Sequence, residues 1–264
     1  TNVALRVEDT DSAETLLVSG RGELHLAILI ETMRREGFEF QVSRPEVITT
    51  EVEGRLHEPV EHLVVDAREE HVGFLTESLA KRLGRMINLH ADGEGNVRLE
   101  FSIPTRGLIG FRNQFLTATR GEGTMASILL GYEPWRGPLA GARNGALVAD
   151  QDGTAVTYGL ANAQERGDTF IEPGTPVYEG MIIGLNAREG AISINVAKQK
   201  KQTNIRSSTA EIAVRLTPAV QLSLEQCLDF LEPDELLEVT PQSLRLRKRT
   251  LNATQRRRQA ATAS

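Results

Sequence analysis

The sequence predicts an α+β fold: an incomplete and then a complete βαββαβ sandwich, followed by a β-rich C-terminal domain with one helix. Near the middle of the chain, Leu99, Phe101 and Ile103 alternate as the residues of a half-buried strand do. Beyond Pro104, which ends the strand, apolar residues recur at helical spacing. One strand therefore feeds one helix on its sheet, and from about residue 139 onward short strands and frequent turns replace this pattern.

The first domain is expected over residues 1–57 as strand, strand, helix and strand. Val3 to Val7 alternate, residues 15–18 form a second strand, and an amphipathic helix then ends at Gly37. These elements amount to about half of a four-stranded sandwich with two helices. We therefore expect the first strand and helix of this domain to lie upstream in a longer chain.

The second domain is expected over residues 58–138 with a complete set of elements. The order βαββαβ is that of the ferredoxin-like split motif. Asp92-Gly-Glu-Gly-Asn96 is expected to be a hairpin turn, because its glycines can adopt positive φ. The expected strands cover 60–67, 86–91, 99–103 and 125–132, and the expected helices cover 73–83 and a stretch with Thr105 as N-cap and Gly121 as C-terminal stop.

Within this domain, Gly107-Leu-Ile-Gly110 has the letters of a GxxG nucleic-acid clamp. The KH module places that loop between two helices, whereas here it follows a strand. Close approach of a helix to its sheet is the alternative reason for these glycines.

The third domain is expected over residues 139–264. Asp152-Gly153 reads as a hairpin turn between strands at 146–149 and 155–160. Ser223-Leu-Glu-Gln226 resembles a capping box that starts the single helix, on whose apolar face Cys227 is expected to lie. Further strands are expected at 177, 181–185, 192–196, 237–240 and 243–247, and the tail from 256 to 264 is expected to be disordered.

Composition limits the possible functions. The net charge of −6 over 264 residues argues against a broadly basic surface, so any nucleic-acid contact must come from local patches. Cys227 is the only cysteine, which excludes an intrachain disulfide and a cysteine-cluster metal site and favours a reducing compartment. No apolar run approaches the roughly 20 residues of a membrane span, so no membrane partner is expected.

Several motifs carry a resemblance to known proteins. Gly22-Glu-Leu-His-Leu26 at a helix start resembles the third domain of elongation-factor-G-type translational GTPases, which gives residues 1–57 as a truncated domain III. Residues 58–138 resemble domain V of the same class, and Ile103-Pro-Thr-Arg-Gly-Leu-Ile-Gly-Phe-Arg112 is similar to the BipA (TypA) branch. The domain V pattern comprises Gly73, Leu79, Arg82, Gly84, Gly110-Phe111 and Thr119-Arg-Gly121. Residues 139–264 would then be the BipA-specific C-terminal domain.

The segment from Lys198 to Ser208 combines cations, amides and hydroxyls with no acid and no aromatic residue. Such side chains suit phosphate and sugar oxygens, and the lack of aromatics argues against base stacking. By itself a charge run is also typical of a solvated turn. The resemblance implies a loop near the acceptor end of transfer RNA in the ribosomal A site, so nucleic-acid contacts are expected from Lys198, Lys200, Lys201, Thr203, Asn204, Arg206 and Ser207.

A second basic cluster lies near the C-terminus. Alternation along the strand places Arg245, Arg247 and Arg249 on one side and Leu244 and Leu246 on the other. These three arginines are further expected nucleic-acid-binding residues, and a solvated sheet face is the alternative.

The sequence has no GxxxxGK[ST] phosphate loop, no recognisable Ser/His/Asp pattern and no paired-carboxylate site. We therefore expect no catalytic, cofactor or metal site in this chain. The resemblance implies a parent GTPase that binds GTP with Mg in missing N-terminal domains. It also implies a cytoplasmic, monomeric portion that docks on the ribosome, contacts 23S rRNA and A-site tRNA, and acts in large-subunit assembly and stress adaptation.

Two other functional classes stay open from the sequence. A regulatory module could use ferredoxin-like domains to bind a small molecule at the edge of a sheet. An α+β hydrolase would require a pocket with perturbed carboxylates or histidines.

Overall fold

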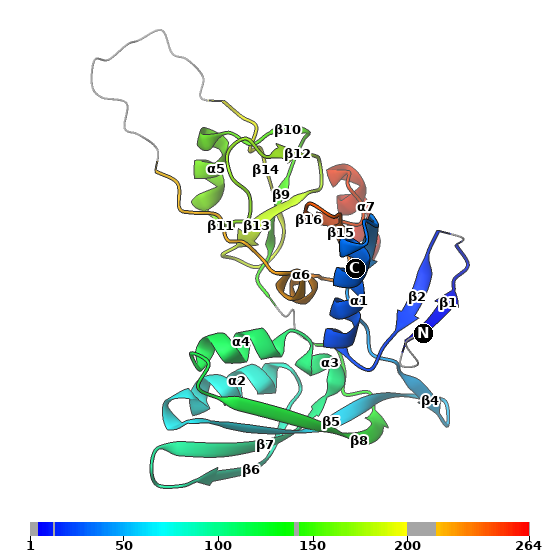
Figure 1. Ribbon diagram of the computed structural model, residues 1–264, viewed down its shortest axis with the longest axis vertical. Helices are drawn as coiled ribbons and strands as arrows, with labels where there is room; N and C mark the ends of the chain where they lie inside the picture. The colour runs from blue at the N-terminus through cyan, green and yellow to red at the C-terminus, as the bar shows by residue number, and fades with distance from the viewer. Residues whose placement is uncertain (1–4, 13, 140–142, 200–214, 264) are drawn as a thin grey trace. The chain divides into compact units, whose positions relative to one another are not determined.

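The structure, a computed structural model, describes residues 5–12, 14–139, 143–199 and 215–263. The chain forms two compact units (Figure 1). Unit 1 combines Thr1–Arg44 with Arg143–Ser264, and unit 2 is Pro45–Ala142. Within the described ranges, no helix is both long enough and apolar enough to cross a membrane.

Unit 2 is a sheet covered by helices on one face (Figure 1). Its main strands run in the antiparallel order β8-β5-β7-β6, with β4 paired to the start of β5. This order confirms the predicted ferredoxin-like sandwich. The elements are β4 (Thr50–Val52), β5 (Arg55–Arg68), the short 3₁₀ helix η1 (Glu69–His71), α2 (Val72–Lys81), β6 (Arg85–Ala91), β7 (Asn96–Pro104), α3 (Thr105–Leu108), α4 (Phe111–Ala118) and β8 (Thr124–Pro134).

The core of unit 2 follows from the two predicted periods. Alternate residues of β7, Leu99, Phe101 and Ile103, are buried toward the helices, and Phe111 and Phe115 of α4 pack against them. Burial of each such large apolar side chain stabilises the fold by about 1.5–3 kcal/mol. The strand-to-helix switch at the middle of the chain is thus the centre of this core.

The helix expected after Pro104 is interrupted, so that prediction was wrong in detail. Gly110 has a φ of 71°, a left-handed conformation that favours glycine, and separates α3 from α4. Thr105 is the first residue of α3 and not its N-cap, which is Pro104. The predicted hairpin turn is confirmed, because the Asp92 carboxylate accepts hydrogen bonds from the backbone N–H groups of Glu94 and Asn96 at 2.7 and 3.0 Å.

The described residues of unit 1 form two larger sheets, with strand orders β11-β13-β9-β14 and β16-β15-β3, and two small sheets, β1-β2 and β10-β12. The elements of its N-terminal segment are β1 (Arg6–Asp9), β2 (Leu16–Ser19), α1 (Glu23–Arg35) and β3 (Phe40–Ser43). The elements of its C-terminal segment are β9 (Ala146–Ala149), β10 (Gly153–Thr154), α5 (Thr157–Gln164), β11 (Gly167–Thr169), β12 (Pro176–Val177), β13 (Ile182–Asn186), β14 (Ile192–Ile194), α6 (Leu224–Phe230), β15 (Glu235–Val239), β16 (Leu244–Lys248) and α7 (Ala253–Ala263).

The N-terminal and C-terminal segments of unit 1 share a sheet and a core. Strand β3 pairs antiparallel with β15, with Val42 opposite Leu237. Ala27 and Ile30 of α1 belong to the same buried apolar cluster as Leu228 of α6. Residues far apart in the sequence therefore stabilise one another.

Three predictions for the C-terminal region were wrong. The hairpin expected at Asp152-Gly153 does not form, because Gly153 belongs to β10, which pairs with β12, while β9 pairs with β13 and β14. The strand expected at 155–160 is largely the helix α5, and the tail expected to be disordered lies mostly in the helix α7. The region therefore has more helices than the single one predicted. The predicted capping box is confirmed, because the Ser223 hydroxyl accepts from the Gln226 N–H at 3.2 Å and the Gln226 side chain accepts from the Ser223 N–H at 2.9 Å.

Candidate nucleic-acid interface

The basic segment begins at Lys198, which is exposed to solvent. The other expected contact residues of this segment lie outside the described residues; they are Lys200, Lys201, Thr203, Asn204, Arg206 and Ser207. The structure therefore describes how the chain enters and leaves residues 200–214 and not the contact residues themselves.

Both ends of this segment are held by α5. Before it, the carbonyl of buried Val196 accepts from the Val156 N–H at 2.9 Å, at the N-cap of the helix. After it, the amide of Gln164 donates to the Thr217 carbonyl at 2.7 Å and accepts from the Thr217 N–H at 2.9 Å. The entry and the exit are thus fixed to opposite ends of one helix.

Gly159 lets α5 approach the entering chain closely. A Cβ atom at this position would lie 2.2 Å from the Val196 carbonyl oxygen, far below a normal contact. Close packing therefore explains the glycine at this position. The stretch that contains it forms a helix in place of the expected strand.

The three arginines near β16 differ in their availability. Arg245 and Arg249 are exposed, whereas Arg247 is about 16% exposed and lies 3.2 Å from the Glu238 carboxylate on the neighbouring strand. Glu238 also accepts from the Tyr178 hydroxyl at 2.8 Å. Burial, and then this hydrogen bond, raise the pKa of Tyr178, so it stays a hydrogen-bond donor. Arg247 is therefore engaged within the protein.

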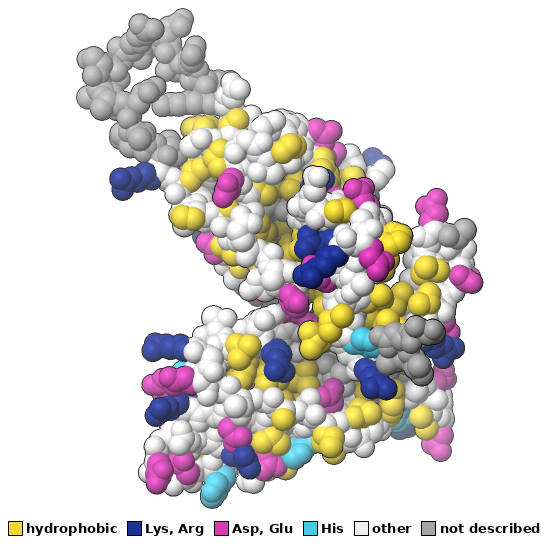
Figure 2. All heavy atoms as spheres, viewed as in Figure 1, with side chains coloured by type: hydrophobic (Ala, Val, Ile, Leu, Met, Phe, Trp, Pro, Cys, Tyr) yellow, Lys and Arg dark blue, Asp and Glu magenta, His cyan; other side chains and the backbone are white. Residues whose placement is uncertain are grey.

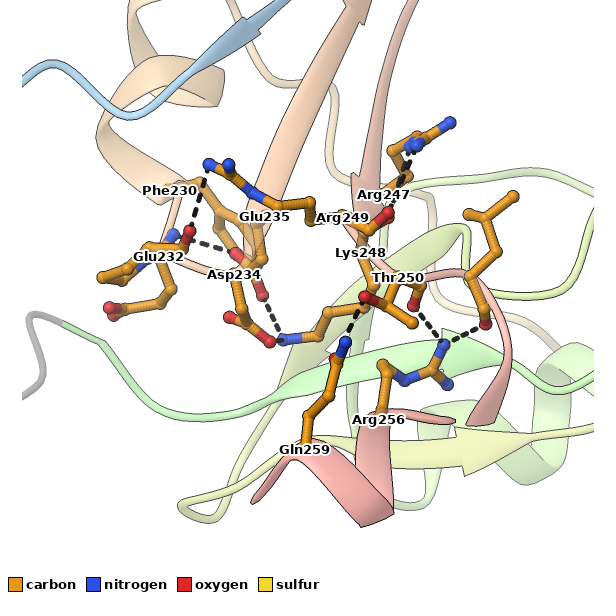
Figure 3. A network of polar contacts seen from close by, with 12 residues as sticks. Phe230, Glu232, Asp234, Glu235, Arg247, Lys248, Arg249, Thr250, Arg256 and Gln259 are labelled. Atoms are coloured by element: carbon orange, nitrogen blue, oxygen red, sulfur yellow. Dashed lines mark hydrogen bonds and ion pairs between the residues drawn. The ribbon is translucent and has the colours of Figure 1, made fainter. Parts of the chain in front are cut away.

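Lys248 is buried and serves the interior of unit 1. Its amino group lies 2.8 Å from the Glu235 carboxylate and 2.9 Å from that of Asp234 (Figure 3). Arg143 donates to the other oxygen of Glu235 and stacks over the Phe230 ring at 3.8 Å. Since Glu235 is only 1% exposed, these two cations neutralise a carboxylate that burial would otherwise destabilise.

Sequence reasoning missed the helix α7, which carries Arg256, Arg257 and Arg258. Asn252 begins the helix by accepting from the N–H groups of Thr254 and Gln255, both at 3.1 Å. The signal for this helix was present in the sequence, because asparagine is a favoured N-cap residue.

The visible face of unit 2 shows acidic and basic side chains mixed together (Figure 2). Many of its charges are paired, as in the Arg98–Asp66 ion pair at 2.7 Å. Arg106, from the stretch that carries the resemblance, pairs with fully buried Glu58 and stacks 3.6 Å from the Trp135 ring. Its charge therefore contributes to the interior of this unit.

The Gly107–Gly110 stretch is occupied by internal contacts. Arg82 donates to the carbonyls of Gly107 and Ile109, each at 2.9 Å. A Cβ atom on Gly107 would lie 2.5 Å from the Arg82 carbonyl oxygen. These contacts favour close packing as the reason for the glycines rather than a nucleic-acid clamp.

A pocket in unit 1 has a volume of about 80 Å³ and is lined by residues that include Phe170, Met181, Cys227 and Arg245. Pockets for drug-sized ligands are typically about 300–1,000 Å³. Burial raises the pKa of the Cys227 thiol to about 12, with a further contribution from Glu225, so the thiol is neutral and unreactive near neutral pH. Among the residues with described positions, no group of His, Cys, Asp and Glu could hold a metal ion.

Two known families match this chain, one over most of unit 2 and one over most of the C-terminal segment of unit 1. The family described as "Elongation factor G C-terminus" matches residues 55–142, and the family described as "TypA/BipA C-terminal domain" matches residues 144–253. These ranges meet close to the boundary between unit 2 and the C-terminal segment of unit 1.

Curated relatives match nearly the whole chain. The large ribosomal subunit assembly factor BipA of Synechocystis sp. is 53% identical over 248 residues, which cover 94% of this chain and 42% of that protein. The proteins of the same name from Bacillus subtilis and Escherichia coli K12 are each 48% identical, over 98% and 97% of this chain. The chain spans about two fifths of the length of these relatives, 42–43%. It therefore belongs to the BipA/TypA family, of which it represents the C-terminal portion, with an elongation-factor-G-type C-terminal domain followed by the BipA C-terminal domain.

Proposed function

We propose that this chain is the ribosome- and RNA-binding portion of a BipA/TypA-type translational GTPase. In this role it docks in the A-site region of the ribosome and contacts tRNA and 23S rRNA through their backbones. The parent protein would act in assembly of the large ribosomal subunit and in stress adaptation, as a cytoplasmic monomer.

The identity of about half of all residues to proteins named large ribosomal subunit assembly factors carries this proposal, because it extends over nearly the whole chain. The structure adds a physical reason. Val196 and Thr217, which lie before and after the acid-free segment at 198–208, are both hydrogen-bonded to α5, so the stretch that carries these cations begins and ends at fixed points of an acidic chain.

Nucleotide hydrolysis is assigned to the remainder of the parent protein. The chain itself has no phosphate-loop motif. GTP and its Mg ion would therefore bind in the N-terminal domains, and this portion would carry no catalytic or cofactor residue.

The contact residues fall into two groups. The segment contributes Lys198, Lys200, Lys201, Thr203, Asn204, Arg206 and Ser207. Near β16, Arg245 and Arg249 are exposed and suited to RNA phosphates, while Arg247 contributes less because Glu238 already neutralises it.

Binding to purified bacterial large ribosomal subunits tests this function. Sedimentation at about 50 and 200 mM salt should show tight binding that weakens steeply as salt rises. Replacing Lys200, Lys201 and Arg206 with Ala should lower the slope of log K against log salt by about 2–3, because three phosphate contacts are lost.

A matched control removes the same number of charges elsewhere. Arg6, Arg21 and Arg35 are exposed residues of the N-terminal segment of unit 1. Their replacement with Ala should leave the slope unchanged. Equal behaviour of the two triple variants would reject the role of the basic segment, and failure of the unmodified chain to bind would reject the proposed function.

The pocket beside Cys227, in the part of the chain that the structure describes, gives little support to the small-molecule alternative, because its volume of about 80 Å³ is below the roughly 300 Å³ or more of a typical ligand site. Thermal shift against amino acids and nucleotides distinguishes it. A saturable rise in melting temperature without ribosome binding would favour a regulatory ligand-binding module.

A further inference from the structure

The helix α7 presents cations that nothing else in the described structure neutralises. Arg257 and Arg258 are exposed, and neither side chain has a hydrogen-bond or ion-pair partner in the part of the chain that the structure describes. The helix Ala253–Ala263 contains no acidic residue in its sequence. Two guanidinium groups are thus free to bind an external anion.

The start of α7 is fixed to the body of unit 1. Arg256 donates to the Thr250 carbonyl at 3.0 Å and also to the carbonyl of Leu251 (Figure 3). The Glu179 carboxylate accepts from the Ala253 N–H at 2.8 Å. Burial lowers the pKa of Arg256, while Glu179 and Asp234 oppose that shift, so the guanidinium remains charged in its position.

Close contact also holds the segment that leads into α7. Gly180 has a φ of 88°, and a Cβ atom there would lie 2.7 Å from the Leu251 Cα. The Thr250 hydroxyl donates to the side-chain carbonyl of Gln259, the residue that follows Arg258, at 3.1 Å. The backbone that carries Arg257 and Arg258 is therefore held on both sides of them, so less backbone entropy is lost when they bind.

The residue types on α7 indicate which anion fits. A guanidinium donates in a planar fork that matches phosphate oxygens, and polypeptide at an RNA surface makes most of its contacts to phosphate and sugar. The helix lacks Leu, Ile, Phe and Trp, so it has no apolar face to enter a lipid interface. These properties favour an RNA backbone over an anionic membrane.

We propose that α7 is a phosphate-contacting helix, in which Arg257 and Arg258 bind an RNA backbone independently of the basic segment at 198–208. This inference rests on the proposed function and adds a second contact region to it. Helix α7 lies in unit 1, at the C-terminal end of the described chain (Figure 1).

The test compares the unmodified chain with R257A/R258A in binding to large ribosomal subunits over a range of salt. The slope of log K against log salt should fall by about 1.5, and affinity at low salt should fall several-fold, because about two phosphate contacts are lost. Circular dichroism should show undiminished helix, since Ala favours helix at least as well as Arg.

Two variants control for charge and chemistry. R257K/R258K keeps both charges and should retain most of the salt slope, while R6A/R35A removes two exposed cations from β1 and α1 and should behave as the unmodified chain. A slope for R257A/R258A that equals that of the unmodified chain would overturn the proposal while leaving the proposed function intact.

Other outcomes separate the remaining possibilities. If the unmodified chain does not bind ribosomal subunits, the proposed function fails and the RNA partner of α7 fails with it. If R257A/R258A instead loses binding to anionic phospholipid vesicles and retains ribosome binding, the RNA assignment is wrong.

Discussion

Basic residues in this chain have different roles that cannot be read from the residue type alone. On β16, Arg245 faces solvent, Arg247 pairs with Glu238, and Lys248 is buried beside Glu235. Lys248 shares strand parity with the apolar residues Leu244 and Leu246. The sequence predicts which side of the strand each residue occupies. It does not predict that a lysine can be buried there, because the desolvation cost of its charge is offset only by a carboxylate from the neighbouring strand.

Glu235 should be essential for the stability of unit 1. Glu235→Gln leaves Lys248 and Arg143 without their shared carboxylate, and removing one partner from a buried pair costs about 3–5 kcal/mol. Urea denaturation measures this loss. Glu8→Gln, which breaks an exposed pair with Arg6, should cost less than about 1 kcal/mol, and equal losses for the two variants would contradict the assigned role of Glu235.

Glu31 should give part of the acid dependence of stability. Hydrogen bonds from Arg34 and Arg35 lower its pKa from 4.5 to about 2. Because the folded pKa lies below the unfolded value, the stabilisation is complete above about pH 4.5 and is lost as the pH falls toward 2.

Glu31→Gln removes this dependence. The variant should lose less stability than the unmodified chain when urea denaturation at pH 5 is compared with about pH 3, by under about 1 kcal/mol because the pair is partly exposed. An identical loss in both proteins would show that Glu31 keeps an ordinary pKa.

At the scale of elements, the contact of α5 with Val196 should depend on glycine. In Gly159→Ala, the new Cβ would lie 2.2 Å from the Val196 carbonyl oxygen, so unit 1 should lose about 1–3 kcal/mol. Amide exchange at residues 196–199 should also become faster, which mass spectrometry can measure.

Gly73 in α2 is the matched control, since a Cβ atom there would meet nothing within 4 Å. Gly73→Ala should be neutral or stabilising by about 0.5–1 kcal/mol. The assignment fails if Gly159→Ala is equally well tolerated.

The elements that the sequence predicts best are those with a long regular period. The alternation of Leu99, Phe101 and Ile103 predicted β7 and its buried face, because β7 lies between β5 and β6 in the sheet and the helices cover one face of it. Short elements were predicted less well. The strand expected at 155–160 is mostly helix, and Gly159 of this helix packs against Val196, a tertiary contact that no local pattern contains.

At the candidate site, too, the sequence predicts some features and misses others. Sequence composition identified the acid-free segment at 198–208 and the exposed Arg245 and Arg249. It could not separate Arg247 from them, because the partner Glu238 is defined only by the register of β15 and β16. It also missed α7, whose anchoring depends on Glu179 from a distant part of the chain.

For the molecule as a whole, unit 1 depends on contacts between segments more than 180 residues apart, such as the pairing of Val42 with Leu237. Ile30→Ala in α1 should therefore destabilise unit 1 by about 2–5 kcal/mol and speed amide exchange in α6 and β15. Ile28, on the same helix but 57% exposed, provides the control, since its replacement with Ala should change stability by no more than about 0.5 kcal/mol. Equal effects would show that α1 does not contribute to this core.

Charge is also organised at the scale of the molecule. A net charge of −6 disfavours diffuse attraction to RNA, so the proposed binding would come from a few local regions. Affinity should therefore respond to a small number of substitutions and remain indifferent to most others.

The attachment of Val196 and Thr217 to opposite ends of α5 has a consequence for how the family can vary. Because the polypeptide is closed at both points, doubling the number of residues between them would add only about 0.6 kcal/mol of loop-closure entropy. Insertions or deletions between these two points would therefore change the length of the stretch that carries the proposed contact residues, at little cost to the stability of unit 1.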